Sequence, residues 1–290
     1  MLRWNRRSAG KYGAPGFAHN PDRPLPAAVR LARSAAAVRP GPPDDPAACP
    51  ESRIPSMKLL AFETATEACS VALWIDGEVR ERYDVVPRRH AELALPWADA
   101  LLAEAGVPRR DLDAIAVGRG PGAFTGVRLA IAIAQGVALG LDRPLVPVST
   151  LAALARPAAQ AHAGTPVLAA IDARMGELYV GAFRMDGGDL VALDDERLQA
   201  PDGVAVDGDG WRGAGTGFAA AGGVLAARLA GQLAGADAAA LPHAADIAAL
   251  AARAFARGEA LAPERVEPAY LRDNVALTLR EQQALRESRR

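Results

Sequence analysis

The sequence predicts a two-domain α/β fold in which one strand–hairpin unit occurs twice. Short apolar strands alternate with helical stretches through most of the chain, a pattern typical of mixed sheets covered by helices. The order strand, hairpin and returning strand in residues 57–86 recurs in residues 167–193. In both copies an acidic residue closes the first strand and a glycine-containing turn joins the next two strands, so we expect a duplicated unit.

Local signals define the first unit. We expect strands at 57–62, 69–75, 78–86, 113–118 and 145–148 and helices at 92–105 and 125–139. Asp76-Gly77 is a strong hairpin turn. Gly106 and Gly140 suit the ends of the two helices, and Pro96 falls in the first turns of the earlier one, where proline costs little. Ser149 is expected to cap a further helix.

The second unit repeats this order, with strands expected at 167–171, 178–185 and 190–193. Two such units face to face make up the actin/hexokinase-like (ASKHA, ribonuclease-H-like) two-domain fold, which we therefore predict. We place the first subdomain at 57–155 and the second at 156–290, with the last residues disordered.

Residues 1–56 differ from the rest of the chain. Prolines and arginines interrupt them throughout, and they show no sustained helical or strand period. Such a segment cannot bury enough apolar surface to offset the cost of ordering. We expect a disordered extension and take Met57 as the physiological start. A transit peptide is the alternative, although the stretch lacks the amphipathic, serine-rich pattern.

Composition excludes several function classes. The 33 lysines and arginines nearly balance the 34 aspartates and glutamates, so no global field attracts nucleic acid or an anionic membrane. Any RNA contact would need a local basic patch. Cys49 and Cys69 form no CxxC or metal-type pair, and no apolar run reaches the roughly 18 residues of a membrane span. We expect a cytoplasmic protein that does not bind a membrane.

The most distinctive segment is the glycine loop, residues 118–128, which follows a strand and opens a helix. Backbone N–H groups in that setting can hold a phosphate, here around Gly120, Gly122, Thr125 and Gly126. The segment lacks the Gly-Lys-Ser/Thr of a Walker loop and the spacing of a dinucleotide fingerprint. A tight turn feeding a closely packed helix explains it equally well, and both interpretations stay open.

The helix after this loop carries small residues at every fourth position, from Gly126 to Ala138, and its other faces are nearly all apolar. A helix apolar all round is expected to be buried all round, and a small-residue stripe lets another helix approach closely. We weigh an interior helix against a subunit interface. For the interface we expect Leu93, Trp97, Leu101, Arg128, Ala130, Ile131, Ala134, Gln135 and Ala138.

The sequence lacks catalytic and phosphate-binding residues at the positions where an enzyme of this fold carries them. In ASKHA enzymes, ATP phosphates lie against two glycine-rich hairpins, whereas residues 63–67 contain no glycine. Side chains at Ala65 and Arg174 would crowd the phosphates. Asp172, Glu177 and Tyr179 are expected to cluster at the cleft, with the carboxylates near Arg174. Residues 213–217 would suit either an adenosine pocket or a turn. The four histidines form no i, i+4 metal pair, so we expect no catalytic residue, cofactor or metal.

Residues 57 to about 275 closely resemble the TsaB (YeaZ) family, the dimerisation subunit of the bacterial tRNA threonylcarbamoyladenosine complex. The strings at 62–73, 120–128, 171–179 and 268–272 carry the match. The enzymatic sister family, TsaD, has an HxxxH metal motif where this chain has residues 148–154, which contain no ligand.

The resemblance implies a non-catalytic scaffold. A TsaD-type subunit would transfer threonylcarbamoyl to the adenosine next to the anticodon of tRNAs that read codons beginning with A. This chain would pair with it, a TsaE-type ATPase would associate with the pair, and a homodimer would compete for the same surface. The alternatives are an independent ATP-dependent kinase-like enzyme and, less favoured, an M22-type metallopeptidase.

Overall fold

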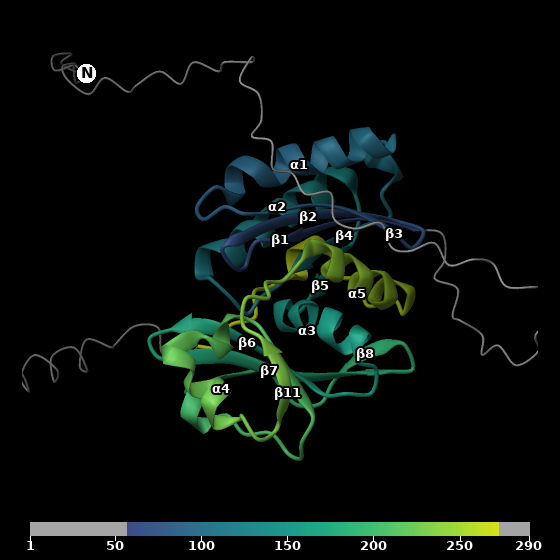
Figure 1. Ribbon diagram of the computed structural model, residues 1–290. Helices are drawn as coiled ribbons and strands as arrows, with labels where there is room; N and C mark the ends of the chain where they lie inside the picture. Colours follow the sequence, from purple (N-terminus) through teal and green to yellow (C-terminus); the bar gives the residue numbers. More distant parts are fainter. Residues whose placement is uncertain (1–56, 273–290) are drawn as a thin grey trace, which may run out of the picture.

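The computed structural model describes residues 57–272, which form two stacked α/β units (Figure 1). The expectations for residues 1–56 and for the last residues of the chain lie outside this described range.

The first unit is a five-stranded mixed sheet in the order β3-β2-β1-β4-β5. Its strands are β1 (Lys58–Glu63), β2 (Ala68–Ile75), β3 (Glu78–Val85), β4 (Ala114–Gly118) and β5 (Leu145–Val148). β1 pairs antiparallel with β2 and parallel with β4. Asp76 and Gly77 both have positive φ, 52° and 101°, as the tight hairpin turn requires. These strands are therefore confirmed to within one or two residues.

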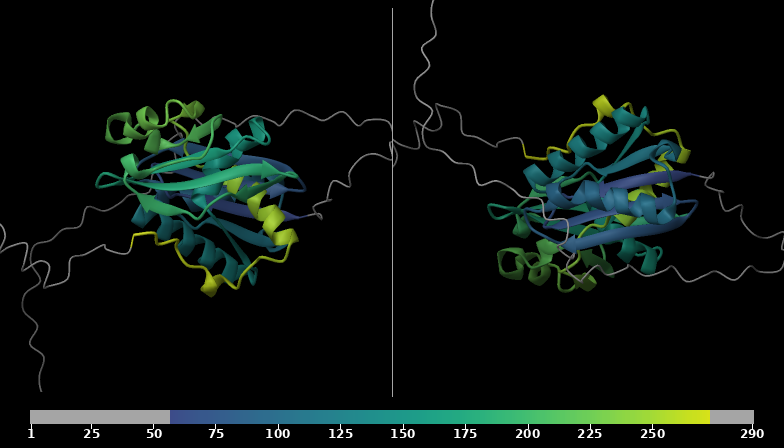
Figure 2. Two further views of the ribbon diagram at one scale, coloured as in Figure 1. Left: turned by 90° about the horizontal axis from the view of Figure 1, so that it is seen from below. Right: turned by 90° about the horizontal axis from the view of Figure 1, so that it is seen from above.

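Helices α1 (His90–Ala105) and α2 (Phe124–Leu141) cover the outer face of this sheet (Figure 2, right). Gly106 ends α1 in the left-handed conformation, as expected. Two details were wrong. Because α1 begins earlier, Pro96 lies inside the helix. α2 continues past Gly140 to Leu141, and the residue that caps it is Asp142 with φ 53°, a conformation that aspartate tolerates.

The second unit repeats the topology. Its strands are β6 (Val167–Arg174), β7 (Glu177–Asp186), β8 (Asp189–Ala192), β10 (Trp211–Ala214) and β11 (Leu233–Asp237), with β9 (Arg197–Gln199) paired to β7. The order β11-β10-β6-β7-β8 reads, from its other edge, like that of the first sheet. In both sheets the central strand pairs antiparallel on one side and parallel on the other. The predicted duplication is confirmed.

Two helices separate the sheets. α3 (Thr150–Ala161), capped by Ser149 as predicted, packs on β6 and β7. α5 (Ala244–Ala256) comes from the end of the second unit but packs on β1 and β2. The division at residue 155 was therefore wrong, because it cuts α3 in two and separates α5 from its sheet. The short α4 (Val224–Arg228) belongs to the second unit.

The first sheet caps α5. Ser70 Oγ accepts a hydrogen bond from the N–H of Ala244 at 2.8 Å, and Glu81 Oε1 accepts one from Ala245 at 3.0 Å. His243 Nδ1 lies 3.0 Å from Glu81 Oε2, and its ring stacks on Tyr83. Burial disfavours the charged forms of Glu81 and His243, but their hydrogen bond and opposite charges outweigh it. The pKa of Glu81 is therefore lowered and that of His243 is raised.

Candidate functional site

A pocket of about 1150 Å³ lies between the two units. Its walls come from residues 65–67, 87–90, 122–128, 171–175, 216–220 and 268–272, together with Tyr179. The fold thus brings together the first hairpin, the glycine loop, the second hairpin and the 268–272 string, which are far apart in the sequence.

The glycine loop is pressed against the first hairpin. A Cβ on Gly122 would lie 2.5 Å from the Ala65 carbonyl oxygen, and one on Gly126 would lie 2.0 Å from that of Thr64. The Ala123 N–H donates to the Ala65 oxygen at 2.7 Å, and the Thr64 hydroxyl donates to the Gly126 oxygen at 2.8 Å. Close backbone packing explains these glycines, which favours the tight-turn interpretation. Phosphate binding by Gly120, Gly122, Thr125 and Gly126 stays a prediction.

Glu63, the acidic residue that closes the first strand, is buried beside the pocket and does not line it. Its Oε1 accepts from the Ala65 N–H at 2.6 Å, and its Oε2 accepts from the Thr150 hydroxyl at 2.9 Å. A Cβ on Gly118 would lie 1.9 Å from this Oε2. Burial raises the pKa of the Glu63 carboxyl to about 7. Its contacts make Glu63 part of the core packing.

The predicted acidic cluster is present, but its pairing differs from the expectation. Asp172 pairs with Arg174 at 3.0 Å, whereas Glu177 pairs with Arg272 at 2.5 Å. The Arg174 side chain is 83% exposed, and Ala65 is buried under the glycine loop. Both residues nevertheless line the pocket, so the expected crowding of a phosphate by these two side chains stays a prediction.

The 213–217 segment behaves as a turn. Gly215 has φ 112°, and a Cβ there would lie 2.3 Å from the Ala170 carbonyl oxygen. The Thr216 hydroxyl accepts from the Asp172 N–H at 3.1 Å and lines the pocket. Glycine at Gly215 thus lets this turn approach β6 closely, which favours the turn over an adenosine pocket.

Residues 261–272 form a strap across the two units. Leu261 pairs with Leu145 at the edge of the first sheet. Gln135 Nε2 donates to the carbonyl oxygens of Pro263 and Val266 at 2.8 and 3.1 Å. Arg272 donates to the Ala173 oxygen at 3.1 Å. Gln135, expected at a partner interface, instead holds the strap within the chain.

Several other expected interface residues face inward. Leu101 and Ile131 are 2% and 5% exposed, and Ala130, Ala134 and Ala138 are fully buried. All five belong to the core between the helices and the first sheet. Their assignment to a partner surface is therefore corrected, because the chain's own sheet already covers them. Leu93 and Trp97 are partly buried against the same core.

The opposite face of α2 is open. Ala132, Gly136, Leu139 and Gly140 are exposed. The helix has 18 residues and a mean hydropathy of 1.6, so it has the length and composition of a membrane span, contrary to the sequence expectation. Because α2 packs on β4 and β1, it is a layer of this α/β unit, with an unusually apolar outer face.

Comparison with known proteins agrees with the fold. A family model described as TsaD, tRNA N6-adenosine threonylcarbamoyltransferase, matches residues 81–279. The tRNA threonylcarbamoyladenosine biosynthesis protein TsaB of Escherichia coli (strain K12) is 42% identical over 226 residues, 76% of this chain and 96% of the relative. TsaB of Haemophilus influenzae is 37% identical over 230 residues, 76% of this chain and 95% of the relative.

A solved structure supports the same assignment. YeaZ from Pseudomonas aeruginosa has 46% sequence identity and a TM-score of 0.69, and the match covers 74% of this chain and 100% of that one. Sequence and structure comparisons thus point to the same family. The chain belongs to the TsaB (YeaZ) family of tRNA threonylcarbamoyladenosine biosynthesis proteins.

Proposed function

We propose that this chain is a non-catalytic, cytoplasmic subunit that activates threonylcarbamoyl transfer to the adenosine next to the anticodon of tRNAs reading codons that begin with A. It pairs with a TsaD-type catalytic subunit, and a TsaE-type ATPase associates with the pair. In this arrangement tRNA reaches the chain through the complex.

The observation that carries this proposal is the outer face of α2. An added Cβ at Gly136 or Gly140 meets nothing within 4 Å, so the backbone is open to a second helix. Leu139 is 61% exposed, and Leu95 on the neighbouring α1 is 46% exposed. Small residues flanked by exposed leucines allow close helix–helix packing, and exposed apolar patches mark interaction sites.

The same outer face of α2 suits both associations expected from the sequence, with a TsaD-type subunit and with a second copy of this chain. A helix pair that lies on the surface of one chain can meet an equivalent helix pair in a related chain or in a second copy, through self-complementary packing. The TsaD-type sister and the homodimer would then compete for α1 and α2. The partner residues proposed here are therefore the outward Ala132, Gly136, Leu139 and Gly140, with Leu95.

The polar groups near the pocket support a role without chemistry of its own. Glu63 is buried among core contacts, and Asp172 and Glu177 are each paired with an arginine. Within residues 57–272, no three His, Cys, Asp or Glu side chains gather as metal ligands would. A metallopeptidase would need such a group of metal ligands facing its substrate.

Reconstitution tests the proposal. Threonylcarbamoyl transfer to tRNA is measured with the sister subunit, the ATPase and activated substrate, with and without this chain. We expect transfer to depend on the chain and the chain alone to show none. ATP hydrolysis or zinc-dependent peptide cleavage by the pure chain, or equal transfer without it, would refute the proposal.

A further inference from the structure

The pocket between the units carries a local excess of positive charge. Its lining contains Arg88, Arg128, Arg174 and Arg272 but only two carboxylates. Arg174 and Arg272 are paired, whereas no carboxylate in the described part of the chain lies within ion-pair distance of Arg88 or Arg128. This is a basic patch of the kind that a chain with a net charge of −1 would need for RNA contact.

Arg128, one of the arginines of this patch, lies against two aromatic rings. Its Cζ lies 3.2 Å from the centroid of the Phe124 ring and 5.1 Å from that of Tyr270. Its Nη1 is buried and has no hydrogen-bond partner among residues 57–272. No carboxylate of the described residues pairs with Arg128, so its guanidinium adds unneutralised positive charge to the pocket lining.

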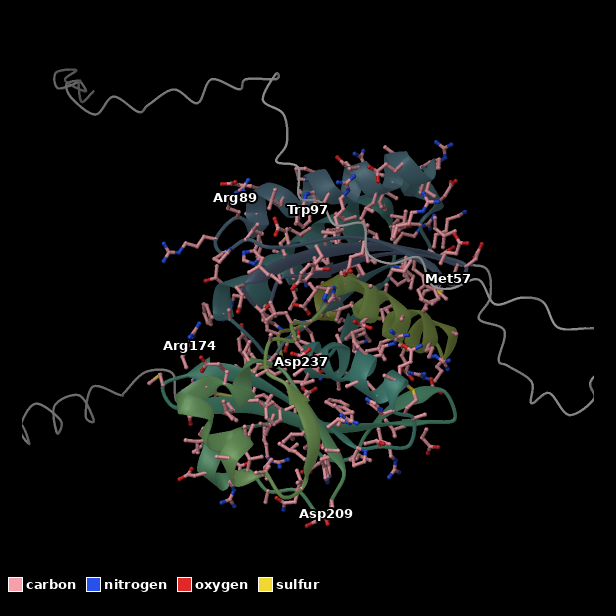
Figure 3. The ribbon with its side chains drawn as sticks, viewed as in Figure 1. Met57, Arg89, Trp97, Arg174, Asp209 and Asp237 are labelled. Carbon is pink, nitrogen blue, oxygen red and sulfur yellow. The ribbon has the colours of Figure 1, made fainter. Side chains whose placement is uncertain are left out.

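Large apolar side chains surround the same pocket and face outward. Phe124 is 62% exposed, Tyr270 is 55% exposed and Met175 is 86% exposed. Exposed rings beside arginines are the usual elements of a surface for single-stranded nucleic acid, because any base can stack on a ring and the phosphates follow the cations. In Figure 3, Arg174 of the second unit and Arg89 of the first lie at the same edge. Arg89 itself pairs with Glu92 outside the pocket and follows the pocket residue Arg88 in sequence.

We propose that this pocket binds a single-stranded segment of RNA, with a base on Phe124 or Tyr270 and phosphates along Arg88, Arg128 and Arg174. The identity of the RNA as tRNA rests on the proposed function. A volume of about 1150 Å³ exceeds the usual 300–1,000 Å³ of a small-molecule site. Cations from three separate segments suit a chain of phosphates better than a single one, and exposed rings favour bases over an acidic peptide.

The test measures binding of a fluorescent RNA of about ten nucleotides, within the range that single-strand binders cover, to the full chain. Arg88→Glu and Arg174→Glu should each weaken binding about fivefold and lower the salt slope by about one. Phe124→Ala should weaken it about tenfold through lost stacking. Arg110→Glu is the matched control, because that side chain is also 83% exposed but lies outside the pocket. Unchanged melting temperatures would show that each variant is folded.

Each alternative gives a different result. Equal binding by the wild type and all three pocket variants would refute the inference, as would binding of AMP or ATP as tight as that of the RNA. Displacement of RNA by poly-glutamate at equal charge, with no effect of Phe124→Ala, would indicate an acidic-peptide site instead. Association with the TsaD-type subunit, measured on the same variants, should stay unchanged, so a failure of the pairing proposal would be seen separately.

Discussion

Substitutions at Gly136 test whether the outer face of α2 pairs with another helix. Gly136 lies within the helix, and an added Cβ meets nothing within 4 Å. Since glycine in a helix interior costs about 1 kcal/mol relative to alanine, Gly136→Ala should raise the free energy of unfolding of the isolated chain by about 1 kcal/mol. For a folded region of this size, that corresponds to a melting temperature about 2–4 °C higher.

Gly136→Trp should weaken the association of α2 with a partner helix. The exposed position accommodates the ring in the isolated chain, but a partner helix would be held away from the backbone. Overpacking of about 3 kcal/mol at the contact corresponds to a loss of affinity of about a hundredfold. Ala134→Trp is the control on the inward face, where full burial means that the ring should destabilise the fold itself by about 3 kcal/mol or more.

Sedimentation with the TsaD-type subunit, and of the chain alone, measures pairing, and thermal denaturation measures folding. If Gly136→Trp pairs as tightly as the wild type, the outer face is not the interface. If Ala134→Trp folds normally but fails to pair, the inward small-residue stripe would be the interface after all.

Three further predictions concern stability. Because the pKa of His243 is raised, its pairing with Glu81 should stabilise the fold fully below pH 6.5 and lose that effect as the pH rises through the raised value. Urea denaturation of His243→Ala and of the wild type across this pH range measures the effect. A difference in unfolding free energy that stays constant with pH would contradict the prediction. The buried Glu63 has a pKa of about 7 against an ordinary 4.5, so stability should fall as the pH rises between these values. Glu63→Gln should flatten that urea-denaturation profile. Gly126→Ala should lower the free energy of unfolding by about 2 kcal/mol, since the new Cβ would lie 2.0 Å from the Thr64 oxygen; an unchanged urea midpoint would show that the loop can move away.

Local signals predicted the sheet well. Asp76-Gly77 fixes a hairpin by its own conformational preferences, and the apolar runs around it have few alternatives to a strand. The end of α2 was harder to predict, because Gly140 and Asp142 can both adopt the left-handed conformation. The domain division failed for a different reason. α5 follows β11 in sequence but packs on the first sheet, and no local pattern encodes that return.

The interface prediction failed because α2 has two stripes of small residues. One runs through Ala130 and Ala134, and the other runs through Ala132 and Gly136. Both have helical spacing, so sequence alone cannot show which stripe faces the sheet. The aromatic–arginine side of the pocket was missed, because it joins Arg128 to Tyr270 across more than a hundred residues, and only tertiary structure makes that contact visible.

The glycine loop determines both how α2 is rotated and which of its residues reach the pocket. Gly122 and Gly126, which resemble a phosphate loop, bring the start of α2 against the first hairpin with no room for a Cβ. A helix fixed at that end has its rotation fixed as well, so Ala130 and Ala134 must face the sheet and Gly136 must face outward. The same constraint places Phe124 and Arg128, in the first turns of α2, at the pocket. We therefore infer that the loop acts by orienting α2, which presents one face for pairing and one end for a ligand.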